Sequence, residues 1–204
     1  MCATRLIGAE PNLVLWGGGN TSIKVTMPDH RGRETDLLWI KGTGSDRLTI
    51  IPSHFAPLRM DDLALLKDRL AITDEEMVSY QARCALQPGS PNPSIETLLH
   101  AFIPAPPVYH THADSICALT DVSDSALMIK RVYRDEVALI PYLRPGFTLA
   151  KDLNAYCNTR NLLMVKITAE DAAEAVLFLA ADRSTTTTGA MIPVDVGIKE
   201  AFPG

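Results

Sequence analysis

Strand-like and helix-like segments alternate along the first 165 residues of this 204-residue chain, and this alternation limits the possible folds more than any other feature. The apolar run "PNLVLW" at 11–16 predicts a strand, with residues 22–27 as its hairpin partner. Further strands are expected on both sides of the Gly-Thr-Gly turn at 42–44, and at 107–113, 137–142 and 161–165. Helical spacing occurs at 60–71, 93–103, 123–135 and 148–158. Such alternation is typical of a layered α/β domain.

The composition excludes several classes of function. The chain has a net charge of -5, so we expect no basic surface for nucleic acid or anionic lipid. No apolar stretch approaches the ~20 residues that a membrane-spanning helix needs. The cysteines (Cys2, Cys84, Cys117 and Cys157) form no Cys-x-x-Cys pair and are expected to be reduced thiols. We therefore expect a cytoplasmic protein that binds neither nucleic acid nor membrane.

Histidines gather in one short part of the chain, close to a glutamate. On an extended strand, His110 and His112 would point to the same face, which suits two imidazoles on one metal ion. Glu96 and His100 are four residues apart on a predicted helix and share a face. A pair of surface imidazoles is the simpler interpretation of His-x-His alone. The nearby carboxylate favours a metal site with a proton-transfer group, and we expect His100 to pack behind it rather than bind the ion.

Two glycine-rich segments lie at 17–22, "GGGNTS", and at 41–46, "KGTGSD". Consecutive glycines let backbone N–H groups approach an anion, and Asn20, Thr21 and Ser22 add side-chain donors. Each segment alone is most often a simple turn. Neither fits a nucleotide-binding motif, so together with the histidine pair they favour a small phosphorylated substrate.

Four motifs occur in an order that resembles the class II aldolase/adducin family. They are "GGGNTSIK" at 17–24, "WIKGTGSD" at 39–46, "PSIETLLH" with "VYHTHAD" at 93–114, and "IPYLRPG" at 140–146. The likeness covers roughly residues 5–165 and is greatest to the rhamnulose-1-phosphate aldolase type of domain that occurs fused to a short-chain dehydrogenase. The resemblance implies a three-layer α/β fold with a mostly antiparallel central sheet.

The resemblance also implies roles for single residues. His110 and His112 match the histidine pair that holds zinc in the family, and Glu96 matches the glutamate that moves the proton beside the ketose carbonyl. The positions that hold the substrate phosphate are matched by Asn20, Thr43, Gly44 and Ser94. Where the family often has a second serine, this chain has Ile95. We expect both glycine-rich loops and the histidine pair to converge on one cleft.

The implied activity is that of a zinc-dependent aldehyde-lyase. Such an enzyme cleaves a ketose 1-phosphate, such as rhamnulose 1-phosphate, into dihydroxyacetone phosphate and an aldehyde. In the family a third, later histidine completes the zinc site, but no histidine follows His112 here. Two imidazoles leave half of a tetrahedral shell to water or to Glu96, so we expect partial zinc occupancy and impaired turnover.

Two other interpretations stay open. One is a non-catalytic module of the same fold, used for binding or oligomerisation. The missing third histidine favours this interpretation. The other is a sugar-phosphate epimerase or dehydratase on the same scaffold. The presence of Glu96, His110 and His112 favours the lyase. In each case we expect a homo-oligomer.

The sequence predicts two parts, an aldolase-like domain at 1–166 and a segment at 167–204 that resembles the end of a short-chain dehydrogenase. The nucleotide loop of a dehydrogenase is absent. Its Tyr-x-x-x-Lys pair is also missing, because Tyr156 is followed four residues later by Arg160. No nicotinamide cofactor is therefore expected.

Overall fold

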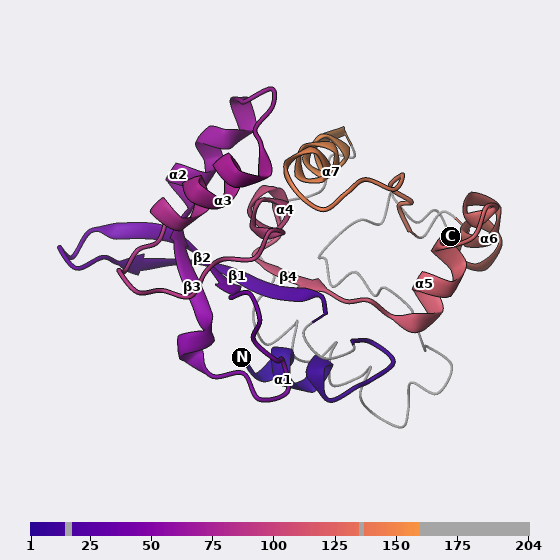
Figure 1. Ribbon diagram of the computed structural model, residues 1–204, viewed down its shortest axis with the longest axis horizontal. Coiled ribbons are helices and arrows are strands. Elements are labelled where there is room, and N and C mark those ends of the chain that lie inside the picture. The colour runs from indigo at the N-terminus through magenta and orange to yellow at the C-terminus, as the bar shows by residue number, and fades with distance from the viewer. Residues whose placement is uncertain (15–17, 135–136, 160–204) are drawn as a thin grey trace.

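The computed structural model describes residues 1–14, 18–134 and 137–159 (Figure 1). Its helices are α1 (Cys2–Gly8), α2 (Met60–Ala64), α3 (Asp74–Arg83), α4 (Thr97–Phe102), α5 (Asp114–Thr120), α6 (Ser125–Tyr133) and α7 (Phe147–Thr159), with short 3-10 segments η1 (Pro52–His54) and η2 (Leu65–Asp68). Its strands are β1 (Asn20–Pro28), β2 (Glu34–Lys41), β3 (Phe55–Arg59) and β4 (Pro107–His110). The predicted strand at 161–165 and the expected segment at 167–204 lie outside the described residues.

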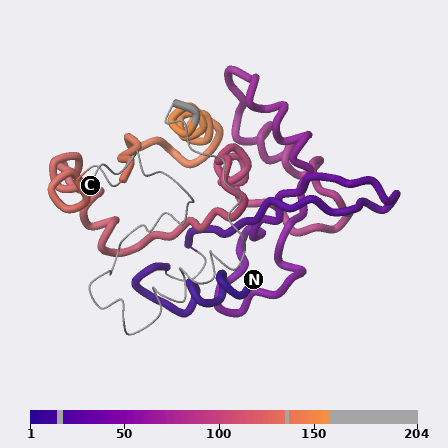
Figure 2. Tube along the Cα trace, turned by 180° about the vertical axis from the view of Figure 1, so that it is seen from behind, coloured from indigo at the N-terminus to yellow at the C-terminus, as the bar shows by residue number. Residues whose placement is uncertain are grey.

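The strands form one antiparallel sheet in the order β3-β2-β1-β4, which confirms the expected sheet type. β1 and β2 form a long hairpin whose turn projects beyond the helices (Figure 2). The side chain of Asp29 shapes this turn by accepting hydrogen bonds from the backbone N–H groups of Arg31 and Arg33, and Gly32 takes a positive φ of 74°. β4 pairs with the other edge of β1, so residues distant in sequence become neighbours.

Helices cover both faces of the sheet and so create three layers. Helices α2, α3, α4 and α7 lie on one face (Figure 1). The main core forms there, where Leu38, Ile40 and Leu58 of the sheet pack with helix residues Leu63, Leu66, Met77, Leu98, Phe102, Phe147 and Ala150. On the other face, α1 contacts β1 through a hydrogen bond of 3.0 Å between the hydroxyls of Thr4 and Thr21.

Strand β1 has a polar face toward helix α4, and this face leads to the candidate site. Side chains alternate between the two faces of a strand. Thr21 therefore points to α1, whereas Ser22 and Lys24 point to α4 and bond to His100. Asn20 shares the face of Ser22 and lies opposite His110 of β4.

Several of the predicted elements are wrong. Residues 11–13 form turns rather than a strand, and the hairpin partner of β1 is β2. No strand follows the turn at 42–44 before Phe55, because Gly42 and Thr43 donate their N–H groups to His54 and Asn92 instead of starting a hairpin. Residues 137–142 also form no strand.

The predicted helices differ in extent. Leu63, Leu66 and Leu70 share a face by helical spacing, yet only the first two are buried. The chain leaves the helical conformation at Arg69, where ψ is 140°, so Leu70 is 97% exposed. The helix expected at 93–103 begins only at Thr97 and places Glu96 at its N-cap position.

No helix in the described ranges is both long enough and apolar enough to cross a membrane.

Candidate active site

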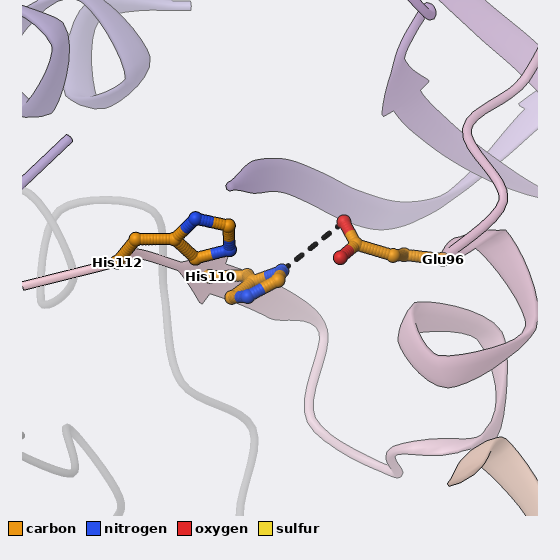
Figure 3. A group of neighbouring side chains, drawn as sticks. All are labelled: Glu96, His110 and His112. Atoms are coloured by element: carbon orange, nitrogen blue, oxygen red, sulfur yellow. Dashed lines mark hydrogen bonds and ion pairs between the residues drawn. The ribbon is translucent and has the colours of Figure 1, made fainter. Parts of the chain in front are cut away.

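Glu96 and His110 are in direct contact. Oε2 of Glu96 lies 3.2 Å from Nδ1 of His110. Figure 3 marks this contact with a dashed line. Glu96 comes from the start of α4, and His110 is the last residue of β4. Because a carboxylate can only accept, His110 donates from Nδ1 in this contact. A metal ion bound by both side chains would take the place of this hydrogen bond.

His112 completes a group of three ligand-bearing side chains. Its ring centroid is 4.9 Å from that of His110, and one ligand atom from each of Glu96, His110 and His112 lies within 4.8 Å of the others. Ideal tetrahedral zinc with bonds of about 2.1 Å would place ligand atoms about 3.4 Å apart. Small side-chain movements would close the difference. The two imidazoles and one carboxylate fit a zinc ion in donor type and nearly in spacing.

The backbone fixes where these side chains start. The N–H of Glu96 donates to the hydroxyl of Ser94 at 3.2 Å, which closes the turn that leads into α4. The N–H of His112 donates to the carbonyl of Leu13 at 3.0 Å, so the segment after β4 lies along the N-terminal part of the chain. His112 thus lies past the end of β4, rather than on the strand that was predicted to hold both histidines.

The protonation states also suit a metal ion. Burial opposes ionisation of Glu96, but the hydrogen bond from His110 and the nearby imidazoles outweigh it, so the pKa of this carboxyl lies below its ordinary value. Burial and the neighbouring His110 lower the pKa of His112. An ionised carboxylate and neutral imidazoles are the forms that bind metal ions.

The residues expected at the phosphate lie next to this group. Asn20 is the strand partner of His110, and Thr43 donates from its hydroxyl to the carbonyl of Pro93 at 3.2 Å. Ser94 follows directly in sequence, and Gly44 has a φ of +78° that favours glycine. These contacts link Asn20 and Ser94 directly to residues of the group, and Thr43 to the turn before it, whereas Gly44 is placed only through its chain neighbour Thr43. Thr21 is the exception among the expected donors, because its hydroxyl faces α1.

His100 is fully buried behind the group, as the sequence predicted. Its Nδ1 lies 2.8 Å from the hydroxyl of Ser22, and its ring centroid is 6.3 Å from that of His110. Burial is the main cause that lowers the pKa of His100, to about 3, so the ring is neutral at physiological pH.

Two buried cations near the site were not predicted. Lys41 and Arg47 are 3% and 0% exposed. The negative charge of Glu96 acts to raise the pKa of both, against the larger effect of burial. Burial lowers the pKa of Arg47 to about 10, which still leaves the guanidinium charged at neutral pH. Lys41 belongs to one of the quoted motifs, but no spacing in the sequence singles out Arg47.

Comparisons with known proteins match this chain to one family. The Class II Aldolase and Adducin N-terminal domain family matches residues 1–178. "Uncharacterized oxidoreductase YuxG" of Bacillus subtilis (strain 168) is 44% identical over 148 residues, which cover 72% of this chain and 22% of that protein. The chain therefore spans about a fifth of the length of this curated relative.

A solved structure shares the fold. The N-terminal class II aldolase domain of a conserved protein from Thermoplasma acidophilum is 42% identical, with a TM-score of 0.71, and the match covers 76% of this chain and 72% of that chain. Together with the family match over 1–178, this similarity shows that the chain belongs to the class II aldolase/adducin family.

Proposed function

We propose that this chain is a zinc-dependent aldolase that cleaves a ketose 1-phosphate, such as rhamnulose 1-phosphate, to dihydroxyacetone phosphate and an aldehyde. The observation that carries the proposal is the group formed by Glu96, His110 and His112, with ligand atoms within 4.8 Å of one another. Family membership supports a metal-dependent aldolase, and the half-buried carboxylate beside two imidazoles supports the assignment of the site.

In this proposal, Glu96 moves the proton. In cleavage the C4 hydroxyl loses its proton and becomes the aldehyde carbonyl as the C3–C4 bond of the ketose breaks. The electrons of that bond pass to C3 and the C2 carbonyl oxygen, and C3 then takes a proton to give dihydroxyacetone phosphate. By microscopic reversibility, the ionised Glu96 takes that proton in the aldol direction and returns it in cleavage. A bound zinc ion would supply Lewis-acid stabilisation of the negative charge on the substrate oxygens, worth several kcal/mol.

The substrate phosphate would bind beside the metal group. The side-chain amide of Asn20 donates to no described residue, and the hydroxyl of Ser94 accepts from Glu96 and so can still donate its own hydrogen. The N–H of Gly44 donates to no described residue either. Thr43 is the weakest of the four, because its hydroxyl already donates to Pro93 and its N–H to Asn92.

A non-catalytic module is the second candidate. The observation that favours it is that no histidine follows His112, which leaves two imidazoles and Glu96 as the candidate ligands among the described residues. The word oxidoreductase in the name of YuxG need not describe the matched segment, since the match covers 22% of that protein. We also propose that the chain acts in the cytoplasm as a homo-oligomer.

Metal analysis and one assay test the proposal. The protein is purified in metal-free buffer, loaded with zinc and dialysed, and its zinc content is compared with that of a His110→Ala, His112→Ala double variant. Dihydroxyacetone phosphate release from rhamnulose 1-phosphate is then measured. Zinc binding with release, both lost in the double variant, supports the lyase. Zinc binding without release from this or other ketose 1-phosphates supports the non-catalytic module, and equal zinc content in both proteins rejects the site.

A further inference from the structure

Arg47 is a fully buried arginine that lies against the backbone of the metal-binding strand. Its side chain is 0% exposed, and one terminal nitrogen, Nη2, donates a hydrogen bond to the backbone carbonyl of His110. Arg47 and His110 are 63 residues apart in sequence. The contact therefore joins the segment after the second glycine-rich loop to the first residue of the His-x-His pair.

Two glycines leave room for this side chain. A Cβ atom on Gly19 would lie 2.3 Å from Nη2 of Arg47 and 2.3 Å from the His110 carbonyl oxygen. A Cβ atom on Gly8 would lie 2.7 Å from Cβ of Arg47. Neither distance is tolerated by real side chains. The end of α1 and the first glycine-rich loop thus both approach the arginine as closely as backbone can.

Within 1–14, 18–134 and 137–159, no ion pair explains the burial of this charge. Arg47 forms no salt bridge with any described residue, and its Nε and Nη1 atoms are buried without a hydrogen-bond partner in the described part of the chain. Leaving buried donors unsatisfied costs about 1–3 kcal/mol each, more for charged groups. A residue kept for packing alone would avoid this cost, because a methionine of similar length carries no donors.

We propose that Arg47 is a positioning residue that holds His110 in the orientation needed to bind the metal ion. The hydrogen bond to the His110 carbonyl fixes the last residue of β4 at the point where the strand ends and the chain turns toward His112. This inference rests on the metal site proposed above. Because Arg47 is buried, it touches neither metal nor substrate and acts only through His110.

Charge and position predict opposite effects of removing Arg47. A nearby positive charge repels a divalent cation, so a purely electrostatic role predicts tighter metal binding when the charge is lost. A positioning role predicts weaker binding, because removing a group that orients a metal ligand typically lowers metal affinity 10–100-fold. The sign of the change therefore separates the two roles.

Cobalt(II) is a suitable probe, because its visible absorption reports both affinity and ligand geometry. We would titrate chelator-treated wild type, Arg47→Met, Arg47→Lys and Arg59→Met at one pH. Arg59 is the matched control, since it also donates to a backbone carbonyl, that of Ala85 at 2.9 Å, but at the end of β3. Thermal unfolding in chelator shows whether each variant is folded without metal.

We expect Arg47→Met to weaken cobalt affinity by about 10-fold or more and to change the absorption spectrum. Arg47→Lys should recover part of the affinity, because an ammonium can still donate to the His110 carbonyl. Arg59→Met should bind cobalt as the wild type does.

Wild type that binds no cobalt would overturn the metal site and this inference together. Wild type that binds cobalt, with a folded Arg47→Met variant of equal or higher affinity, would overturn the role of Arg47 alone. If Arg47→Met does not fold, Arg47→Lys decides: a weakened affinity supports the positioning role, and wild-type affinity with an unchanged spectrum rejects it.

Discussion

The hydroxyl of Ser22 lies 2.8 Å from Nδ1 of His100, and this contact fastens strand β1 to the helix that follows Glu96. Two residues further along the strand, the ammonium of Lys24 donates to the backbone carbonyls of His100 and Ala105, each at 2.8 Å. Strand β1 thus holds α4 and the start of the connection to β4. The distance between Glu96 and His110 depends on both of these segments, so β1 supports the site beyond its own residue Asn20.

His100 should make the protein sensitive to acid. Its pKa is about 3 in the folded protein, below the ordinary value of 6.5, because burial disfavours the imidazolium. Between these pH values the unfolded chain holds a proton that the folded protein excludes. The free energy of unfolding should therefore fall as pH drops from about 6.5 to about 3, with a slope approaching about 1.4 kcal/mol per pH unit.

Urea unfolding in chelator at a series of pH values measures this slope. His100→Gln should flatten it, whatever the variant loses in absolute stability. His30→Gln is the control, because His30 is exposed on the β1–β2 turn. Equal slopes for wild type and His100→Gln would show that His100 is not the source of acid sensitivity.

Lys24 should make the free energy of unfolding depend on pH in the alkaline range. Burial, with a smaller effect of Lys67, lowers the pKa of Lys24 from 10.5 to about 7. Between these values the unfolded chain binds the proton that the folded protein has released, so the free energy of unfolding should rise with pH from about 7 to about 10.5. The difference in unfolding free energy between wild type and Lys24→Met should grow over this range. For the exposed Lys130→Met control it should stay constant.

Glu96→Gln tests the chemical step. Glutamine keeps the shape of the side chain but cannot accept a proton, so turnover should fall by roughly 100-fold or more. The inhibition constant of inorganic phosphate should stay nearly unchanged. Glu75→Gln, on the exposed side of α3, is the control and should leave both quantities as they are. Full turnover in the Glu96 variant would remove this residue from the mechanism.

Asn20→Ala and Ser94→Ala test binding of the phosphate. Each removes one donor to a charged group, a loss of about 1.5–3 kcal/mol, so KM should rise about 10-fold or more while kcat changes little. Thr21→Ala is a close control, because this neighbour of Asn20 bonds to Thr4 on the other face of the sheet. A fall in kcat without a rise in KM would place these side chains at the reacting carbons instead.

The sequence predicted which side chains lie together better than it predicted the elements that hold them. Glu96, His110 and His112 have ligand atoms near one another in the structure, as their short spacing in the sequence suggested. The strand predicted at 11–16 is not formed in its described part, 11–14, because an apolar run indicates burial but does not supply a partner strand. The strand β3 was missed because Pro57 breaks the usual strand composition.

Helix α3 carried a signal that could have been used. Thr73 and Glu76 form a capping box, in which the Thr73 hydroxyl accepts from the N–H of Glu76 and the Glu76 carboxylate accepts from the N–H of Thr73. Arg47 had no such signal. Arg47 is buried because Gly8, Gly19 and His110 all lie close to it in the folded chain. No pattern in the sequence around Arg47 indicates that these distant residues become its neighbours.

The contacts that build the site connect parts of the chain that are far apart, and this has a kinetic consequence. Arg47 and His110 are separated by 63 residues, and Ser22 and His100 by 78, whereas β1 and β2 meet through a short turn. Loops of this length close slowly compared with a hairpin, because their closure entropy must be offset before distant contacts form. During refolding, the β1–β2 hairpin should therefore form before β4 joins it. The capacity to bind a metal ion should appear last, so cobalt absorption would time the final step of folding rather than its onset.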